Sequence, residues 1–180
     1  MRRARATALL ALMVLAAGAL AQSVVPLGAR LRVRWQGRTV RLIEGGRTHL
    51  VSIEGQFNGA GLESVKLQSA KEANGAIYLL LDVSGPSKIP PDARQCGAGV
   101  ESNLIWLKLD QNWKLLDAKN FLYDSCWSPI GSSDGPAWQG DTLTVTADKF
   151  SADSTETMVA TYSYNRPEEG LKVTTRPAAK

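Results

Sequence analysis

The feature that most constrains this chain is a succession of short strand-like segments separated by turn residues. The segments are rich in β-branched, aromatic and alternating apolar residues, and Gly, Pro, Asn and Asp fall between them. No helical period of useful length accompanies them, and 66–74 is the one candidate for a helical turn. The pattern predicts an all-β fold, an antiparallel β-sandwich of about ten short strands, with a closed β-barrel as the alternative. The predicted strands are 31–35, 38–43, 49–53, 65–68, 77–83, 103–109, 113–125, 142–147, 157–164 and 171–175.

The N-terminus predicts a secretory signal peptide. Three arginines precede an uncharged apolar run over 8–20, and Ala19-Leu20-Ala21 has the small-x-small pattern of a cleavage site. The run is shorter than the roughly 20 residues that a membrane helix needs. We therefore expect residues 1–21 to be removed, leaving 22–180 as one soluble β domain that is periplasmic or secreted. No later segment is apolar enough to predict a membrane span.

The charge of the chain argues against nucleic acid as a partner. The full chain has 21 Lys and Arg against 17 Asp and Glu, and a net charge of +4. Arg2, Arg3 and Arg5 lie in the predicted signal peptide, so 18 basic residues remain in the mature chain and its net charge is near +1. A nearly neutral domain has no global attraction to a polyanion such as DNA or RNA.

The two cysteines, Cys96 and Cys126, predict one disulfide. An even number of cysteines in an exported chain favours a disulfide, and this pair permits only one intramolecular bond. The segment between them predicts a long hairpin about Gln111 whose open end the disulfide would close, with Cys96 opposite Cys126. Both faces of this hairpin are apolar over part of their length, with Trp106 and Trp113 expected in the core. That pattern predicts a strand pair buried on both sides.

Arginines cluster in the segment LRVRWQGRTVRL. If the hairpin turns at Gln36-Gly37, one face carries four arginines and the other carries Leu31, Val33, Val40 and Leu42. In this register Arg32 stands opposite Arg41, and like charges placed so repel each other. One interpretation is a solvated outer face. The other is a binding site for lipid phosphate, an acidic glycan or an acidic patch on a protein. The arginines of this predicted site are Arg30, Arg32, Arg34 and Arg41.

Two tryptophans bracket a Gly-, Ser- and Pro-rich segment over 127–140. Trp127 and Trp138 are candidates for stacking on sugar rings or for anchoring a partner. The alternative interpretation is a loop whose two ends are pinned to the core.

No catalytic, metal or cofactor site is predicted. His49 is the only histidine, and we expect it at the surface or at a strand edge. The segment Asp110-Gln111-Asn112 lacks the glycine and the distal glutamate of a calcium loop, so it is interpreted as a turn. Four carboxylates form a weak candidate set for acid–base hydrolysis of a glycan. They are Glu63, Glu101, Asp124 and Asp134.

These observations predict an exported, non-enzymatic binding protein of the cell envelope. Its expected partner is an anionic envelope component, such as a glycan or a lipid phosphate, or another exported protein. A carboxylate-dependent glycan hydrolase and an assembly protein that pairs through its sheet edges are the alternatives.

Overall fold

The computed structural model describes residues 27–88 and 99–178, which are almost entirely β-strand. Two short helical turns, α1 (Leu27–Arg30) and the 3-10 helix η1 (Pro167–Glu169), accompany the strands. The strands are β1 (Arg32–Gln36), β2 (Thr39–Glu44), β3 (Arg47–Ser52), β4 (Ser64–Ala73), β5 (Ala76–Pro86), β6 (Val100–Leu109), β7 (Leu115–Ser125), β8 (Ile130–Gly131), β9 (Ala137–Gln139), β10 (Thr142–Phe150), β11 (Thr155–Ser163) and β12 (Lys172–Pro177).

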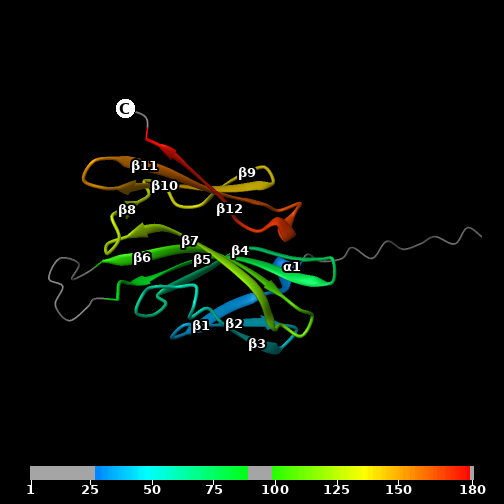
Figure 1. The fold of residues 1–180 in the computed structure, drawn as a ribbon. Coiled ribbons are helices and arrows are strands. Elements are labelled where there is room, and N and C mark those ends of the chain that lie inside the picture. Colours follow the sequence, from blue (N-terminus) through cyan, green and yellow to red (C-terminus); the bar gives the residue numbers. More distant parts are fainter. Residues whose placement is uncertain (1–26, 89–98, 179–180) are drawn as a thin grey trace, which may run out of the picture.

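The strands form two antiparallel sheets arranged as three layers. The first sheet has the order β1-β2-β3, and the second has the order β12-β11-β10-β8-β7-β6-β5-β4, with β9 beside β10. In Figure 1 the green strands β4–β7 lie in the middle, with the blue strands β1–β3 on one side and the yellow-to-red strands β8–β12 on the other. Of these middle strands, β5 and β6 are buried on both faces.

The first hydrophobic core lies between β1–β3 and one face of β4–β7. Val40 and Leu42 of β2 have no exposed surface and pack in the same cluster as alternate residues of β5 and β6. Phe57 and Ile53, from the loop after β3, complete this core. The alternate residues of β5 and β6 are Ile77, Leu79, Leu81, Val83, Ile105, Leu107 and Leu109.

The second core lies between the other face of β5–β7 and the strands β10 and β11. Leu80, Leu104 and Trp106 pack there against residues of the outer strands. Because β5 and β6 send alternate residues into two different cores, their sequences are apolar on both faces. Of the hairpin predicted to be buried on both sides, β6 is buried so, but β7 is not, since Leu115 and Leu116 are 39% and 54% exposed. Trp106 and Trp113 lie in the core as predicted. The outer strands contribute Leu143, Val145, Ala147, Ala160 and Tyr162.

The predicted all-β, antiparallel architecture is confirmed, and the alternative of a closed barrel is wrong. Both sheets are open paths of strands in the described residues. Residues 66–73 of the one candidate for a helical turn belong to β4, and 127–140 contains β8 and β9 rather than only a loop. No helix of the described ranges 27–88 and 99–178 is long and apolar enough to cross a membrane.

The predicted register of the β6–β7 hairpin is wrong. Leu109 pairs with Leu115, not with Trp113, because residues 110–114 form a wider turn. Asp110 closes this turn, since its carboxylate accepts hydrogen bonds from the amides of Asn112 (2.8 Å) and Lys114 (2.9 Å). Two further register shifts, after Ser102 and after Lys108, move the pairing along the hairpin.

Candidate functional site

The arginine face predicted from the sequence exists on the outer side of β1–β3, with a corrected register. The hairpin turns at Gly37-Arg38, one residue later than predicted, because Gln36 pairs with Thr39. The residue opposite Arg41 is therefore Arg34, and Arg32 lies opposite Ile43. Each residue of β1 therefore pairs with the β2 residue two positions beyond the predicted one. Because side chains alternate along a strand, every side chain stays on its predicted face.

Three arginines of this face are exposed. Arg32, Arg34 and Arg41 point away from the core that Val40 and Leu42 enter. None of the three forms an ion pair within the part of the chain that the structure describes, and Arg41 donates a hydrogen bond to the Gln36 side chain. We name Arg32, Arg34 and Arg41 the arginine face. It holds three positive charges on two neighbouring strands, and no carboxylate of the described residues forms an ion pair with them.

Arg30 does not belong to this face, so that part of the prediction is wrong. It ends α1, which packs beside β4, and its guanidinium lies 3.4 Å from a carboxylate oxygen of Glu44 and 3.7 Å from one of Glu72. Arg30 therefore connects the first sheet to β4. The hairpin pattern of the sequence does not reveal this role, because Arg30 lies in the helical turn Leu27–Arg30 that precedes β1.

Trp127 and Trp138 lie apart. Trp138 in β9 pairs with Leu143 at the start of β10, whereas β8, which follows Trp127, pairs with Asp148 and Lys149 near the end of β10. Six residues of strand separate these pairings, which is about 20 Å. The two indoles therefore do not make one surface, although Trp127 is 50% exposed and contributes to a small hollow beside Glu101.

Trp138 joins the outer layer to the middle layer through a chain of hydrogen bonds. Its indole N–H donates to Gln68 Oε1 (3.3 Å), and Gln68 Nε2 donates to Asp82 Oδ2 (3.3 Å). The hydroxyl of Tyr123 donates to the other oxygen of Asp82 (2.6 Å). Burial and the neighbouring Asp82 carboxylate raise the pKa of Tyr123 above its usual range. For Trp138, the interpretation of a pinned loop end is the better one.

The four candidate carboxylates lie on different elements, and two of them are on loops. Glu63 and Asp134 are exposed on loops, whereas Glu101 is buried and accepts a hydrogen bond from Ser87 Oγ (2.7 Å). Asp124 lies on the strand beside Glu101, and partial burial followed by repulsion from Glu101 raises the pKa of Asp124. Glu101 lines a hollow of about 60 Å³ together with Trp127.

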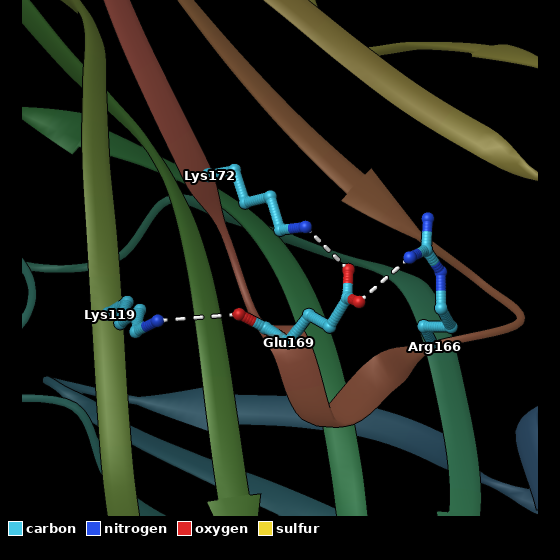
Figure 2. A network of polar contacts seen from close by, with 4 residues as sticks. All are labelled: Lys119, Arg166, Glu169 and Lys172. Atoms are coloured by element: carbon cyan, nitrogen blue, oxygen red, sulfur yellow. Dashed lines mark hydrogen bonds and ion pairs between the residues drawn. The ribbon is translucent and has the colours of Figure 1, made fainter.

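A charged network surrounds Glu169 in η1. Figure 2 shows its carboxylate between Arg166 Nη1 (2.9 Å) and Lys172 Nζ (2.7 Å), while Lys119 Nζ reaches its backbone carbonyl (3.4 Å). The hydrogen bond from Lys172 and the charge of Arg166 lower the pKa of Glu169. The buried indole N–H of Trp106 donates to Pro167 O (2.9 Å). The network therefore holds η1 over the second core.

His49 lies on β3, an edge strand of the first sheet, as the strand-edge prediction has it. It lies half-buried on the inner side of β3, and its ring stacks on Trp113 with centroids 4.3 Å apart and planes 15° apart. The sequence signal that finds this position is alternation, since His49 and Val51 are two residues apart and Val51 is buried.

The two cysteines remain a predicted pair. Cys96 lies outside the described residues, and Cys126 directly follows β7. The amide of Cys126 donates to Val100 O (3.3 Å), so Val100 occupies the position opposite Cys126 that we predicted for Cys96. A Cβ on Gly99 would lie 2.1 Å from the Cβ of Cys126, which shows how closely Gly99 approaches this cysteine.

Comparison of the chain with family models, with curated proteins and with solved structures found no match. The argument about function therefore depends on the residues and their geometry.

Proposed function

We propose that this chain is an exported, non-enzymatic binding domain whose arginine face recognises an anionic component of the cell envelope. The observation that carries the proposal is the direct pairing of Arg34 with Arg41 beside Arg32, on an exposed sheet face without a carboxylate partner among the described residues. Guanidinium groups bind phosphate and carboxylate in a bidentate geometry, so three of them on one face suit a multiply charged ligand.

Export and the disulfide belong to the same proposal. The N-terminal pattern supports passage into an oxidising compartment, where Cys96 and Cys126 form the disulfide. The close approach of Gly99 to Cys126 supports this pairing, because Gly99 follows Cys96 by only three residues in the sequence. Mass analysis of the secreted protein with and without reductant tests it. Two free thiols in the oxidised sample would contradict it.

The alternatives receive less support from the geometry. A glycan hydrolase needs two carboxylates in one cleft, and Glu63 and Asp134 lie exposed on separate loops. An assembly protein needs a long edge strand without charge, but the edge strand β12 carries Lys172, Arg176 and Pro177. The other edge, β4, has a register shift between Leu67 and Ser69. Charge, proline and irregular edges discourage pairing between sheets.

The test measures binding of the mature protein to vesicles of phosphatidylcholine, with and without phosphatidylglycerol, and to an immobilised acidic polysaccharide. The two supports separate lipid phosphate from glycan carboxylate or sulfate as the ligand. We expect binding to one anionic support that weakens as salt is added. Arg34→Ser with Arg41→Ser removes two charges. A basic residue near an anionic surface contributes about 1 kcal/mol, so Kd should rise about thirtyfold.

The matched control is Lys66→Ser with Arg176→Ser. These residues are also exposed on strands and form no ion pair among the described residues, so the change in net charge is the same. If both double variants lose binding equally, attraction is general and the arginine face is not the site. The proposal of an anionic envelope component would also be contradicted if the wild type bound neither anionic support, or if it retained only an acidic protein.

A further inference from the structure

Three turns meet around an open hollow of about 700 Å³ at one end of the first two layers. They are the β2–β3 turn, the β4–β5 turn and the wide β6–β7 turn, and each connects strands that pack in the first core. The hollow is separate from the arginine face, because none of Arg32, Arg34 and Arg41 lines it. Its lining residues include Glu44, Arg47, His49, Glu72, Gln111 and Trp113.

The hollow has an apolar floor and a polar rim. Ile77 and Trp113 are buried at 5% and 9% exposure, and both belong to the first core. Arg47, Glu72 and Gln111 around them are exposed. Ligand sites in proteins combine apolar side chains with placed polar groups that fix the orientation of the ligand, and in this hollow the polar side chains predominate.

The backbone of Trp113 adds an independent observation. Its φ is 65°, a left-handed conformation that is a genuine outlier for a bulky residue. The turn is held by the Asp110 carboxylate, and the amide of Trp113 also donates to Asp110 O (3.0 Å). This conformation places the indole under His49 in the hollow. Strained residues of this kind concentrate at functional sites, where the surrounding structure maintains the strain.

The charges of the hollow select the class of ligand. The Glu44 and Glu72 carboxylates both face Arg30, which partly neutralises them, and Arg47 adds a second positive charge. Two carboxylates and two guanidinium groups leave no net charge to attract a strongly anionic or cationic ligand. The rim nonetheless offers many planar groups that donate or accept hydrogen bonds. They are the carboxylates, the Arg47 guanidinium and the amides of Asn74, Gln111 and Asn112.

We propose that this hollow binds a neutral sugar unit of an oligosaccharide. Sugar hydroxyls pair with planar carboxylate, amide and guanidinium groups, and the apolar C–H face of a pyranose ring packs on the half-buried His49 ring, which itself stacks on Trp113. The site acts independently of the arginine face.

The only histidine of the chain gives this proposal a direct probe, because its imidazole signals in an NMR spectrum have no competitor. The experiment titrates the mature protein with chitotetraose and with cellotetraose, both neutral, and with tetragalacturonate as an acidic sugar. We expect the His49 ring signals to shift and saturate with a neutral tetrasaccharide, and calorimetry to give the same Kd.

The variant Gln111→Ala removes one rim amide from an exposed turn without touching Asp110. We expect at least a fivefold rise in Kd for the sugar, whereas the control Gln139→Ala, an exposed amide in β9, leaves Kd unchanged. The double variant Arg34→Ser with Arg41→Ser should also leave Kd unchanged, so this proposal and the previous one fail separately. Absence of binding by both neutral sugars at millimolar concentration, binding of tetragalacturonate alone, or binding that leaves the His49 signals unmoved would each overturn the proposal.

Discussion

Arg34 and Arg41 lie directly opposite each other in the β1–β2 pair, and both are exposed. Opposite residues of an antiparallel pair have Cβ atoms about 5 Å apart, and like charges there destabilise the pair. The neighbouring strand β3 places Leu50, 63% exposed, opposite Arg41 rather than an acidic residue. The face therefore keeps a repulsion that a single substitution would remove, and the binding role proposed above would account for it.

The first prediction concerns this repulsion. Arg41→Glu changes the pair with Arg34 from repulsive to attractive, so the free energy of unfolding should rise by a few tenths to about 1 kcal/mol. Urea unfolding at low and high salt measures it, and the gain should shrink at high salt because exposed charges are screened. Arg41→Gln is the control, and its free energy of unfolding should fall between those of the wild type and Arg41→Glu. A loss of stability in Arg41→Glu at low salt would show that the repulsion is not significant.

The second prediction concerns Asn103, which is fully buried and has no hydrogen-bond partner among the described residues for either polar atom of its side chain. It lies opposite Val83 and Leu122. An unpaired buried amide costs about 1–3 kcal/mol. Asn103→Leu has the same branching without the polar atoms, so we expect the free energy of unfolding to stay the same or rise by about 1 kcal/mol.

Asn120→Leu on β7 is the comparison for Asn103→Leu. The side-chain amide of Asn120 donates to Gln56 O (2.9 Å), so its removal should lower the free energy of unfolding. Urea unfolding of both variants gives the sign of each effect. If Asn103→Leu is the more destabilised of the two, the amide of Asn103 contributes to stability and the prediction is wrong.

The fold class was predictable from the sequence because a strand that is buried on both faces has an almost continuously apolar sequence. Residues 103–109 are apolar at almost every position, and the structure sends their alternate side chains into two cores. The segment 66–74 misled because Lys, Gln, Ala and Glu favour helices in isolation. In the structure this segment is an edge strand, where Ala70 packs in the first core while Lys66 and Glu72 are exposed.

Register and site were harder to predict, since they depend on single-residue shifts. Gln36-Gly37 and Gly37-Arg38 are both acceptable two-residue turns, and only the paired strands decide between them. The wide turn at 110–114 and the two shifts in β7 likewise have no distinct sequence signal. The stack of His49 on Trp113 depends on that wide turn and on the left-handed Trp113, so the hollow was not predictable from the sequence.

The third prediction concerns Tyr123 at alkaline pH. Burial and the hydrogen bond to Asp82 raise the pKa of Tyr123 in the folded state above its usual value of about 10. Above pH 10 the unfolded chain therefore releases a proton that the folded chain keeps, so the free energy of unfolding falls as pH rises. In Tyr123→Phe this fall should be less steep. Urea unfolding between pH 8 and 11 measures both slopes, and equal slopes would contradict the raised pKa. Tyr162, whose pKa burial also raises, accounts for part of the remaining slope.

The fourth prediction tests how the loop after β3 closes the first core. Gly85 in β5 lies against this loop so closely that a Cβ there would stand 1.9 Å from the carbonyl oxygen of Gly61. The same loop is held by hydrogen bonds from the amide of Ala60 to Pro86 O (2.7 Å) and from that of Glu63 to Ser84 O (2.9 Å). Gly85→Ala therefore forces backbone atoms apart, and we expect the free energy of unfolding to fall by about 2–3 kcal/mol.

Gly135→Ala separates this packing effect from the general effect of replacing glycine. Gly135 has no positive φ and no atom within 4 Å of the position of a Cβ, so alanine there only restricts the unfolded chain. It should leave stability unchanged or raise it by up to about 1 kcal/mol. Thermal and urea unfolding of both variants test the contrast. If Gly85→Ala and Gly135→Ala are equally stable, the loop does not approach β5 at Gly85. The loop residues Ile53 and Phe57 would then not pack in the first core.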